Sequence, residues 1–200
     1  MLGKPFSEII ESALDFFVAQ SWQADQFPSF GSLVCVQNQN VLIVAVVTQA
    51  HSGSMDPLRS PFPYQKTEAE LHAEQPQIFA FLKTTFKAQI IASFDTQTNT
   101  PSYLLPQAPS KIHSFVFHVP ITIQKIILKN PAFMYLLFSA AQAISNLDEL
   151  LLVLLKTIQK NDEKKDSIFI REFCHTFSML TGNDYRRLRL FLHRIESLHS

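Results

Sequence analysis

The chain has 200 residues, and its 17 Lys and Arg balance 17 Asp and Glu, so its formal charge at pH 7 is zero. This balance argues against a protein whose main task is to coat nucleic acid or an anionic membrane, because both tasks need an excess of basic residues. Hydrophobic residues make up 46% of the chain, which predicts a substantial core at this length.

The chain has only four glycines, and the closest two, Gly31 and Gly53, lie far apart. A Walker A loop, a dinucleotide-binding fingerprint and a nucleophile elbow each need glycines within about five positions of one another. The sequence therefore excludes a P-loop nucleotide hydrolase. We expect a protein that is not an enzyme and has no catalytic residues, although a hydrolase of an unrelated type stays open.

Cys35 and Cys174 stand in apolar stretches, and we expect both to be buried free thiols, which suits a reducing compartment. Acidic residues interrupt the N-terminal 20 residues, and no stretch reaches the roughly 20 apolar residues of a membrane span. Histidines and cysteines do not pair at metal-ligand spacing. We expect a cytoplasmic protein with no membrane contact, no cofactor and no metal.

Residues 6–19 place apolar side chains at near-helical spacing, with acidic residues early in the segment. This pattern predicts an amphipathic helix, since acidic residues are favourable near a helix N-terminus. We therefore interpret residues 1–29 as an N-terminal helix and a linker.

Two runs rich in β-branched residues, 30–36 and 41–48, flank a short polar stretch and predict a hairpin. The second run is apolar on both faces, so we expect both faces to be covered. After a Pro-rich loop, Thr67 and Glu70 form a capping-box pattern that predicts a helix from Glu68. Pro76 divides this helix or kinks it. We expect the insertion at about 67–83 to form a lid.

Residues 86–94 alternate between apolar and polar, which is the clearest strand pattern in the chain. Shorter β runs follow at 103–105 and 113–119. Short strands with long connections favour a small antiparallel barrel over residues 30–119.

Beyond Pro120 the pattern is helical, with apolar residues three or four apart. We expect a helical bundle over residues 120–200, with helices at 121–128, 133–144, 147–160, 168–180 and 185–198. The predicted fold class is therefore α+β: a small antiparallel β-barrel with a helical lid, followed by an all-α helical C-terminal region. The first 120 residues carry a formal charge of −3 and the rest +3.

Several short motifs resemble the HAS barrel, the small β-barrel at the N-terminus of HerA-type helicases and of the catalytic subunits of ATP synthase. The matching segments are residues 30–34, 56–62, 74–79, 85–86, 104–106 and 112–116. The segments 74–79 and 183–189 are similar to stand-alone HAS-barrel proteins of cyanobacterial type. In one respect the chain departs from the family, because residues 43–46 contain no glycine where members often have one.

The resemblance implies a barrel used for assembly, which packs subunits or docks partners while a separate motor domain hydrolyses nucleotide. These 200 residues contain no P-loop of the kind that such a motor needs. Asp56 and Arg59 could lock a turn or contact a partner. Glu74 and Gln75 lie in the segment with the closest resemblance. Glu70 and Glu74 share a helix face, where helix capping is a simpler interpretation than acid–base chemistry.

The last predicted helix carries four arginines in nine residues, with Arg186 and Arg189 on one side and Arg187 and Arg194 on another. They could bind an acidic partner or phosphate groups. Alternatively, they could form only a solvent-exposed border beside the packed apolar face of the helix. The leading hypothesis is a non-catalytic module that binds a partner protein or copies of itself. The alternative is a nucleic-acid-associated accessory factor of a HerA-type repair system.

Overall fold

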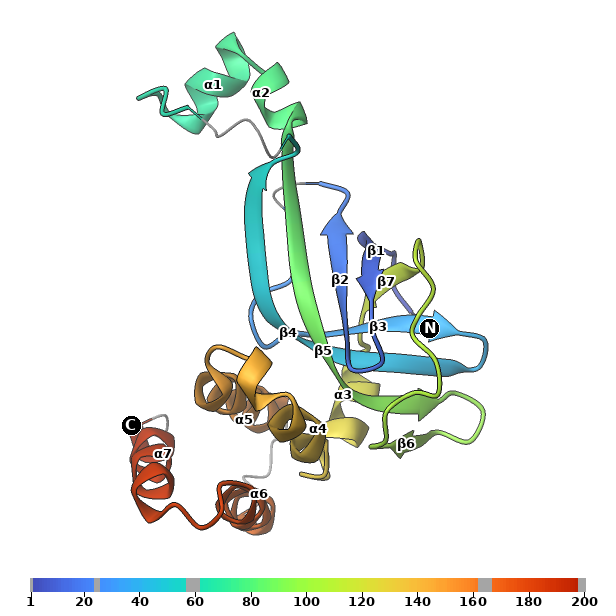
Figure 1. Ribbon diagram of the computed structural model, residues 1–200, viewed down its shortest axis with the longest axis vertical. Coiled ribbons are helices and arrows are strands. Elements are labelled where there is room, and N and C mark those ends of the chain that lie inside the picture. Colours follow the sequence, from blue (N-terminus) through green and yellow to red (C-terminus); the bar gives the residue numbers. More distant parts are fainter. Residues whose placement is uncertain (1, 24–25, 57–61, 162–166, 198–200) are drawn as a thin grey trace.

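The computed structural model describes residues 2–23, 26–56, 62–161 and 167–197, and in these ranges a β-barrel packs against a layer of helices (Figure 1). Seven strands of the described ranges join in one antiparallel sheet. They are β1 (Ser7–Ser12), β2 (Phe16–Ser21), β3 (Leu33–Asn38), β4 (Val41–Ser54), β5 (Leu82–Asp95), β6 (Thr100–Ser102) and β7 (Phe115–His118).

Six of these strands close the predicted barrel in the order β2-β1-β7-β3-β4-β5, because β5 also pairs with β2. The long strand β5 pairs with two different strands along the same edge. Residues 85–89 pair with β2 and complete the barrel, whereas residues 93–95 pair with β6 outside it. The predicted α+β class with a small antiparallel barrel is confirmed.

The predicted N-terminal helix is wrong, because residues 7–21 form the β1–β2 hairpin and belong to the barrel. Ile9, Phe17 and Ala19 are fully buried inside it. Their spacing fits a helix face as well as alternating strand positions, and the turn at Ala13 contains no glycine that would have signalled a hairpin. The barrel therefore begins at Ser7 and not at residue 30.

Two other predicted strands have different bounds in the structure. The strand expected at 103–105 lies at β6, and Leu104 is exposed. The strand expected at 113–119 shortens to β7, after a left-handed backbone at His113 (φ 71°).

Residues 42–47 of β4 are buried on both faces, as the apolar run 41–48 predicted, and so are residues 33–36 of β3 and 88–92 of β5. Ile43, Ala45 and Val47 point into the barrel and pack with its interior residues. Val44 and Val46 lie on the opposite face, in a cluster with the C-terminal helices. One strand thus belongs to two hydrophobic cores.

The helices after Pro120 form the second layer, as predicted. They are α3 (Ile121–Leu128), α4 (Phe133–Ser139), α5 (Leu147–Asn161), α6 (Ser167–Leu180) and α7 (Tyr185–Ser197), with a 3-10 turn at Ala141–Ala143. Stacked rings of Phe173, Phe177 and Phe191 join α6 to α7.

The insertion between β4 and β5 folds as two short helices, α1 (Glu68–Glu74) and α2 (Gln77–Ala80), separated at Pro76. They bury no residue and lie at the far end of the hairpin, away from the barrel (Figure 1). The outer face of β4 is covered instead by the C-terminal helices. The cover therefore comes from a different part of the chain than the expected lid.

Gly31 fixes the point where the chain enters β3, and this yields a stability prediction. Its backbone is left-handed (φ +78°), and an added Cβ would lie 2.4 Å from the Cγ1 atom of Val153. Gly182 is also left-handed (φ +66°) but has open space around it. Gly31→Ala should lower the free energy of unfolding by about 2–4 kcal/mol, and Gly182→Ala by about 1 kcal/mol.

Urea unfolding of the two variants measures the difference. Equal losses would show that Gly31 is required only for its backbone angle and not for close contact with α5.

Candidate functional site

The residues predicted to contact a partner separate into two groups at opposite ends of the molecule (Figure 1). Asp56 follows β4, and Glu74 and Gln75 end α1, so these three lie near the far end of the β4–β5 hairpin. Arg186, Arg187, Arg189 and Arg194 all lie on α7. Arg59 lies outside the described residues. The two groups cannot form one site within a single chain.

The acidic residues of α1 hold the helix together. The backbone N–H of Thr67 donates to Oε2 of Glu70 at 2.7 Å, and the backbone N–H of Glu70 donates to Oγ1 of Thr67. The pKa of Glu70 is lowered first by the hydrogen bond from the Thr67 backbone and then by one that the Thr67 hydroxyl donates to the same carboxylate at 2.8 Å. Glu74 forms an ion pair with Lys66, and the Gln75 N–H donates to the Leu71 carbonyl. The predicted capping box is confirmed.

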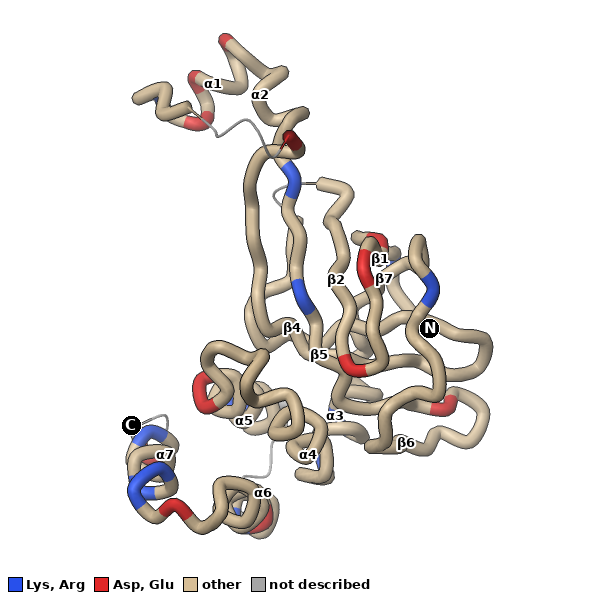
Figure 2. The backbone as a smooth tube through the Cα atoms, viewed as in Figure 1, with Lys and Arg blue, Asp and Glu red and all other residues tan. Residues whose placement is uncertain are grey.

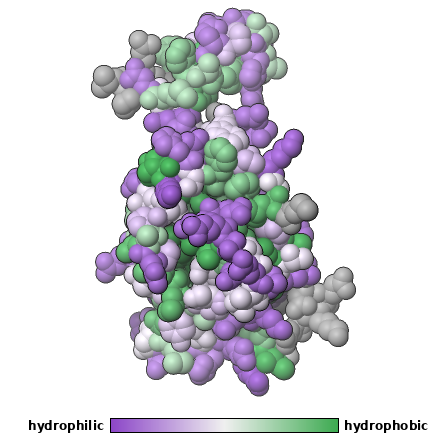
Figure 3. All heavy atoms as spheres, turned by 90° about the vertical axis from the view of Figure 1, so that its right-hand side faces the viewer, coloured by the Kyte–Doolittle hydropathy of each residue, from purple (hydrophilic) through white to green (hydrophobic). Residues whose placement is uncertain are grey.

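The far end of the hairpin exposes large hydrophobic side chains. Phe62 is 71% exposed and Phe81 61%, and Met55 and Tyr64 are also exposed. In Figure 3 this part forms the upper end of the molecule, apart from the body. Hydrophobic and hydrophilic residues lie side by side on it. Exposed apolar residues that gather in one place, unlike scattered ones, indicate an interaction surface.

The far half of β4 has one unpaired backbone edge in the described part of the chain. β3 pairs with β4 only as far as Val46, and the last contacts beyond it join Val47 to Gly31 and Ser32. Residues 49–54 pair with β5 alone. We call residues 49–54 the free edge, and residues 49–56 and 62–84, which include α1 and α2, the arm.

The free edge lacks charged residues and proline, two of the usual protections against strand pairing, and a β-bulge lies beside it between Val47 and Gln49. Natural edge strands are blunted by lysine, proline, inward charges or covering segments. Residues 49–54 contain no proline and no Asp, Glu, Lys or Arg, and residues 49–52 are exposed. On the other side the ladder to β5 is complete, with a hydroxyl contact of 2.7 Å between Ser52 and Thr84. The edge is therefore ordered and accessible.

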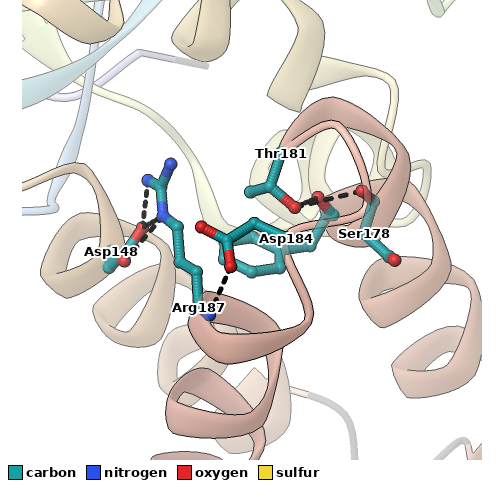
Figure 4. A network of polar contacts seen from close by, with 6 residues as sticks. Asp148, Ser178, Thr181, Asp184 and Arg187 are labelled. Carbon is teal, nitrogen blue, oxygen red and sulfur yellow. Dashed lines mark hydrogen bonds and ion pairs between the residues drawn. The ribbon is translucent and has the colours of Figure 1, made fainter.

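On α7, two of the four arginines bind acidic residues of α5. Nε of Arg187 donates to both carboxylate oxygens of Asp148, at 3.2 and 3.1 Å, and Nη2 donates to Oδ1 at 2.6 Å (Figure 4). These hydrogen bonds raise the pKa of Arg187. Arg194 forms an ion pair of 2.5 Å with Glu149. The Asp184 carboxylate caps the start of α7 by accepting from the Arg187 N–H.

Arg186 and Arg189 lie on the exposed side of α7, as the predicted split of the arginines requires, and neither forms an ion pair with a described residue. Figure 2 shows the basic residues of α7 at one end of the molecule and the acidic residues of α1 at the other. Only half of the predicted arginine patch is therefore available to a partner.

A cleft of about 940 Å³ lies between β6, the α3–α4 turn and α6, which sequence reasoning missed because its walls are distant in sequence. Lys129, Arg171, Glu172 and His175 are among the residues that line it. Tyr103 donates its hydroxyl to the Ile127 carbonyl at 2.8 Å, and burial raises its pKa to about 12. This tyrosine therefore stays protonated and closes one wall of the cleft.

Among the residues that the structure describes, no three His, Cys, Asp or Glu side chains gather as metal ligands do. In the same ranges no helix combines the length and hydrophobicity needed to cross a bilayer. Comparison with known proteins finds no family model and no curated protein that matches the chain. The HAS-barrel resemblance therefore stays a prediction.

The Arg187–Asp148 pair should contribute to stability, not to partner binding. Both side chains are about a third exposed, so solvent screening limits their coupling to about 1 kcal/mol. We expect a double-mutant cycle with Arg187→Gln and Asp148→Asn to measure this coupling by urea unfolding.

Arg186→Gln is the matched control and should change stability by less than about 0.5 kcal/mol. A coupling near zero, or an equal loss in the control, would contradict the assignment of Arg187 to the α5–α7 contact.

Proposed function

We propose that the chain is a non-catalytic protein-interaction module, built on a HAS-like barrel, that docks a partner protein through its arm. The observation that carries this proposal is the arm itself. It extends the hairpin past both neighbouring strands, exposes apolar side chains and leaves a backbone edge unpaired.

Physical chemistry supports a docking role because the arm buries little within its own chain. A lone two-stranded hairpin is marginally stable, and helices shorter than about 12 residues rarely persist without packing. α1 has 7 residues, α2 has 4, and neither buries a side chain. A partner that covers the arm would bury Phe81 and pair with the free edge.

We further propose a cytoplasmic location. Cys35 and Cys174 are both free thiols, and Cys35 is fully buried, which raises its pKa to about 12. A chain with a large core and no disulfide bond among its described residues suits a reducing compartment.

The alternative, a nucleic-acid-associated accessory factor, has less support. Arg187 and Arg194 face acidic residues of α5, so only Arg186 and Arg189 of this group could contact phosphates. Two phosphate contacts give weak binding with a shallow salt dependence. Salt-dependent affinity for DNA that is lost in Arg186→Gln with Arg189→Gln would restore this alternative.

The docking proposal predicts that an exposed hydrophobic residue of the arm is needed for partner binding. Phe81→Glu should reduce recovery of the partner from the protein's own cells about tenfold or more, because burying an unpaired charge is unfavourable. Leu104→Glu is the matched control, since Leu104 is 74% exposed but lies outside the arm. Amine cross-linking and mass spectrometry should place the partner beside Lys66 and Lys83.

Two outcomes would contradict the proposal. One is equal partner recovery with Phe81→Glu and Leu104→Glu. The other is a set of cross-links that avoids the arm and maps to lysines of the helical layer, such as Lys125 and Lys156.

A further inference from the structure

We propose that the free edge pairs antiparallel with the free edge of a second copy of this chain, so that the two arms form one continuous sheet in a two-fold symmetric dimer. This inference rests on the proposed docking function of the arm and names its partner.

The free edge is compatible with a copy of itself. Its side chains are Gln, Ala, His, Ser, Gly and Ser, so self-pairing places no like charges opposite one another. Small residues at 50 and 52–54 allow close approach of two backbones. An antiparallel pair of identical edges also satisfies two-fold symmetry, the commonest symmetry of soluble oligomers.

The lysines of the arm do not oppose this pairing. Lys83 and Lys87 lie on β5, which is separated from the partner's β5 by the two paired β4 edges. With strands about 4.8 Å apart, three strand spacings separate the lysines of the two copies by about 14 Å. That exceeds the Debye length of about 8 Å at physiological ionic strength, so their repulsion is screened.

The charge distribution favours a second copy in the antiparallel direction. Within one chain the acidic α1 and the basic α7 lie at opposite ends, and in the view of Figure 2 both lie on the side where β4 forms the border of the arm. Antiparallel pairing turns each α1 toward the end of the partner that carries α7. There Arg186 and Arg189 have no ion pair within the described part of their own chain. Parallel pairing would instead bring the two acidic ends together.

A six-residue edge supplies a limited number of backbone hydrogen bonds, and association carries a large entropic cost. We therefore expect a reversible dimer with a dissociation constant on the order of 10 μM.

Sedimentation equilibrium of the full chain between about 1 and 200 μM tests the inference. The wild-type chain should pass from monomer to dimer over this range. His51→Lys should weaken the dimer about tenfold or more, because it places like charges in the centre of the paired edges. Ser102→Lys is the matched control, since it adds the same charge to the exposed strand β6 and should leave dimerisation unchanged.

A charge-reversal mixture adds a readout that misfolding cannot imitate. His51→Lys and His51→Glu should each dimerise more weakly alone than the wild type, and a mixture of the two should form a tighter heterodimer. Arg186→Gln with Arg189→Gln should weaken the wild-type dimer several-fold and reduce its salt dependence, whereas Arg171→Gln on α6 should not.

A chain that stays monomeric at the highest concentration overturns the inference, as does a His51→Lys variant that dimerises like the wild type. If the chain is monomeric while Phe81→Glu still loses a cellular partner that Leu104→Glu retains, self-pairing fails and the docking function stands. If that difference is also absent, both fail.

Discussion

The burial of β4 on both faces is the constraint on which the rest of the structure depends. Alternate residues of its first half point into the barrel, and the residues between them pack against the C-terminal helices. Fully burying each Val or Ile side chain contributes about 1.5–3 kcal/mol, so this half is fixed from two sides. The second half lies beyond β3, its last three residues also lie beyond the part of β5 that pairs with β2, and it inherits its direction from the first half. An arm that projects from a strand fixed in this way has a defined orientation, which a flexible loop would lack.

The two-sided burial could be predicted from the sequence, because a strand covered on both faces must be apolar at consecutive positions, as residues 41–47 are. The capping box at Thr67 and the break at Pro76 depend only on local geometry, and both are confirmed. The N-terminal hairpin could not be predicted, because its apolar spacing fits a helix equally well. Its strands are stabilised by pairing with β7 and β5, which closes the barrel. This pairing depends on the whole sheet and not on the local sequence.

The candidate site was predictable only where a single helix decides the geometry. The division of the α7 arginines into two sides follows from helical periodicity, and the structure places Arg187 and Arg194 against α5. The free edge depends on where β3 begins, and that is set by the turn at Gly31 and its contact with Val153. No local pattern in residues 49–54 indicates that their neighbour strand is missing. The resemblance implied a barrel used for assembly, and the role of the arm in assembly is a proposal supported by this geometry.

Amide hydrogen exchange along β4 tests the account most directly, because the two halves of one strand should behave differently. In dilute protein the account predicts slow exchange at residues 42–47 and fast exchange for the edge amides of residues 49–54, since unprotected backbone exchanges readily. Exchange at residues 49–54 should slow as the protein concentration rises, while residues 42–47 stay unchanged. Strong protection of residues 49–54 in dilute monomer, or exchange there that is independent of concentration, would contradict the account.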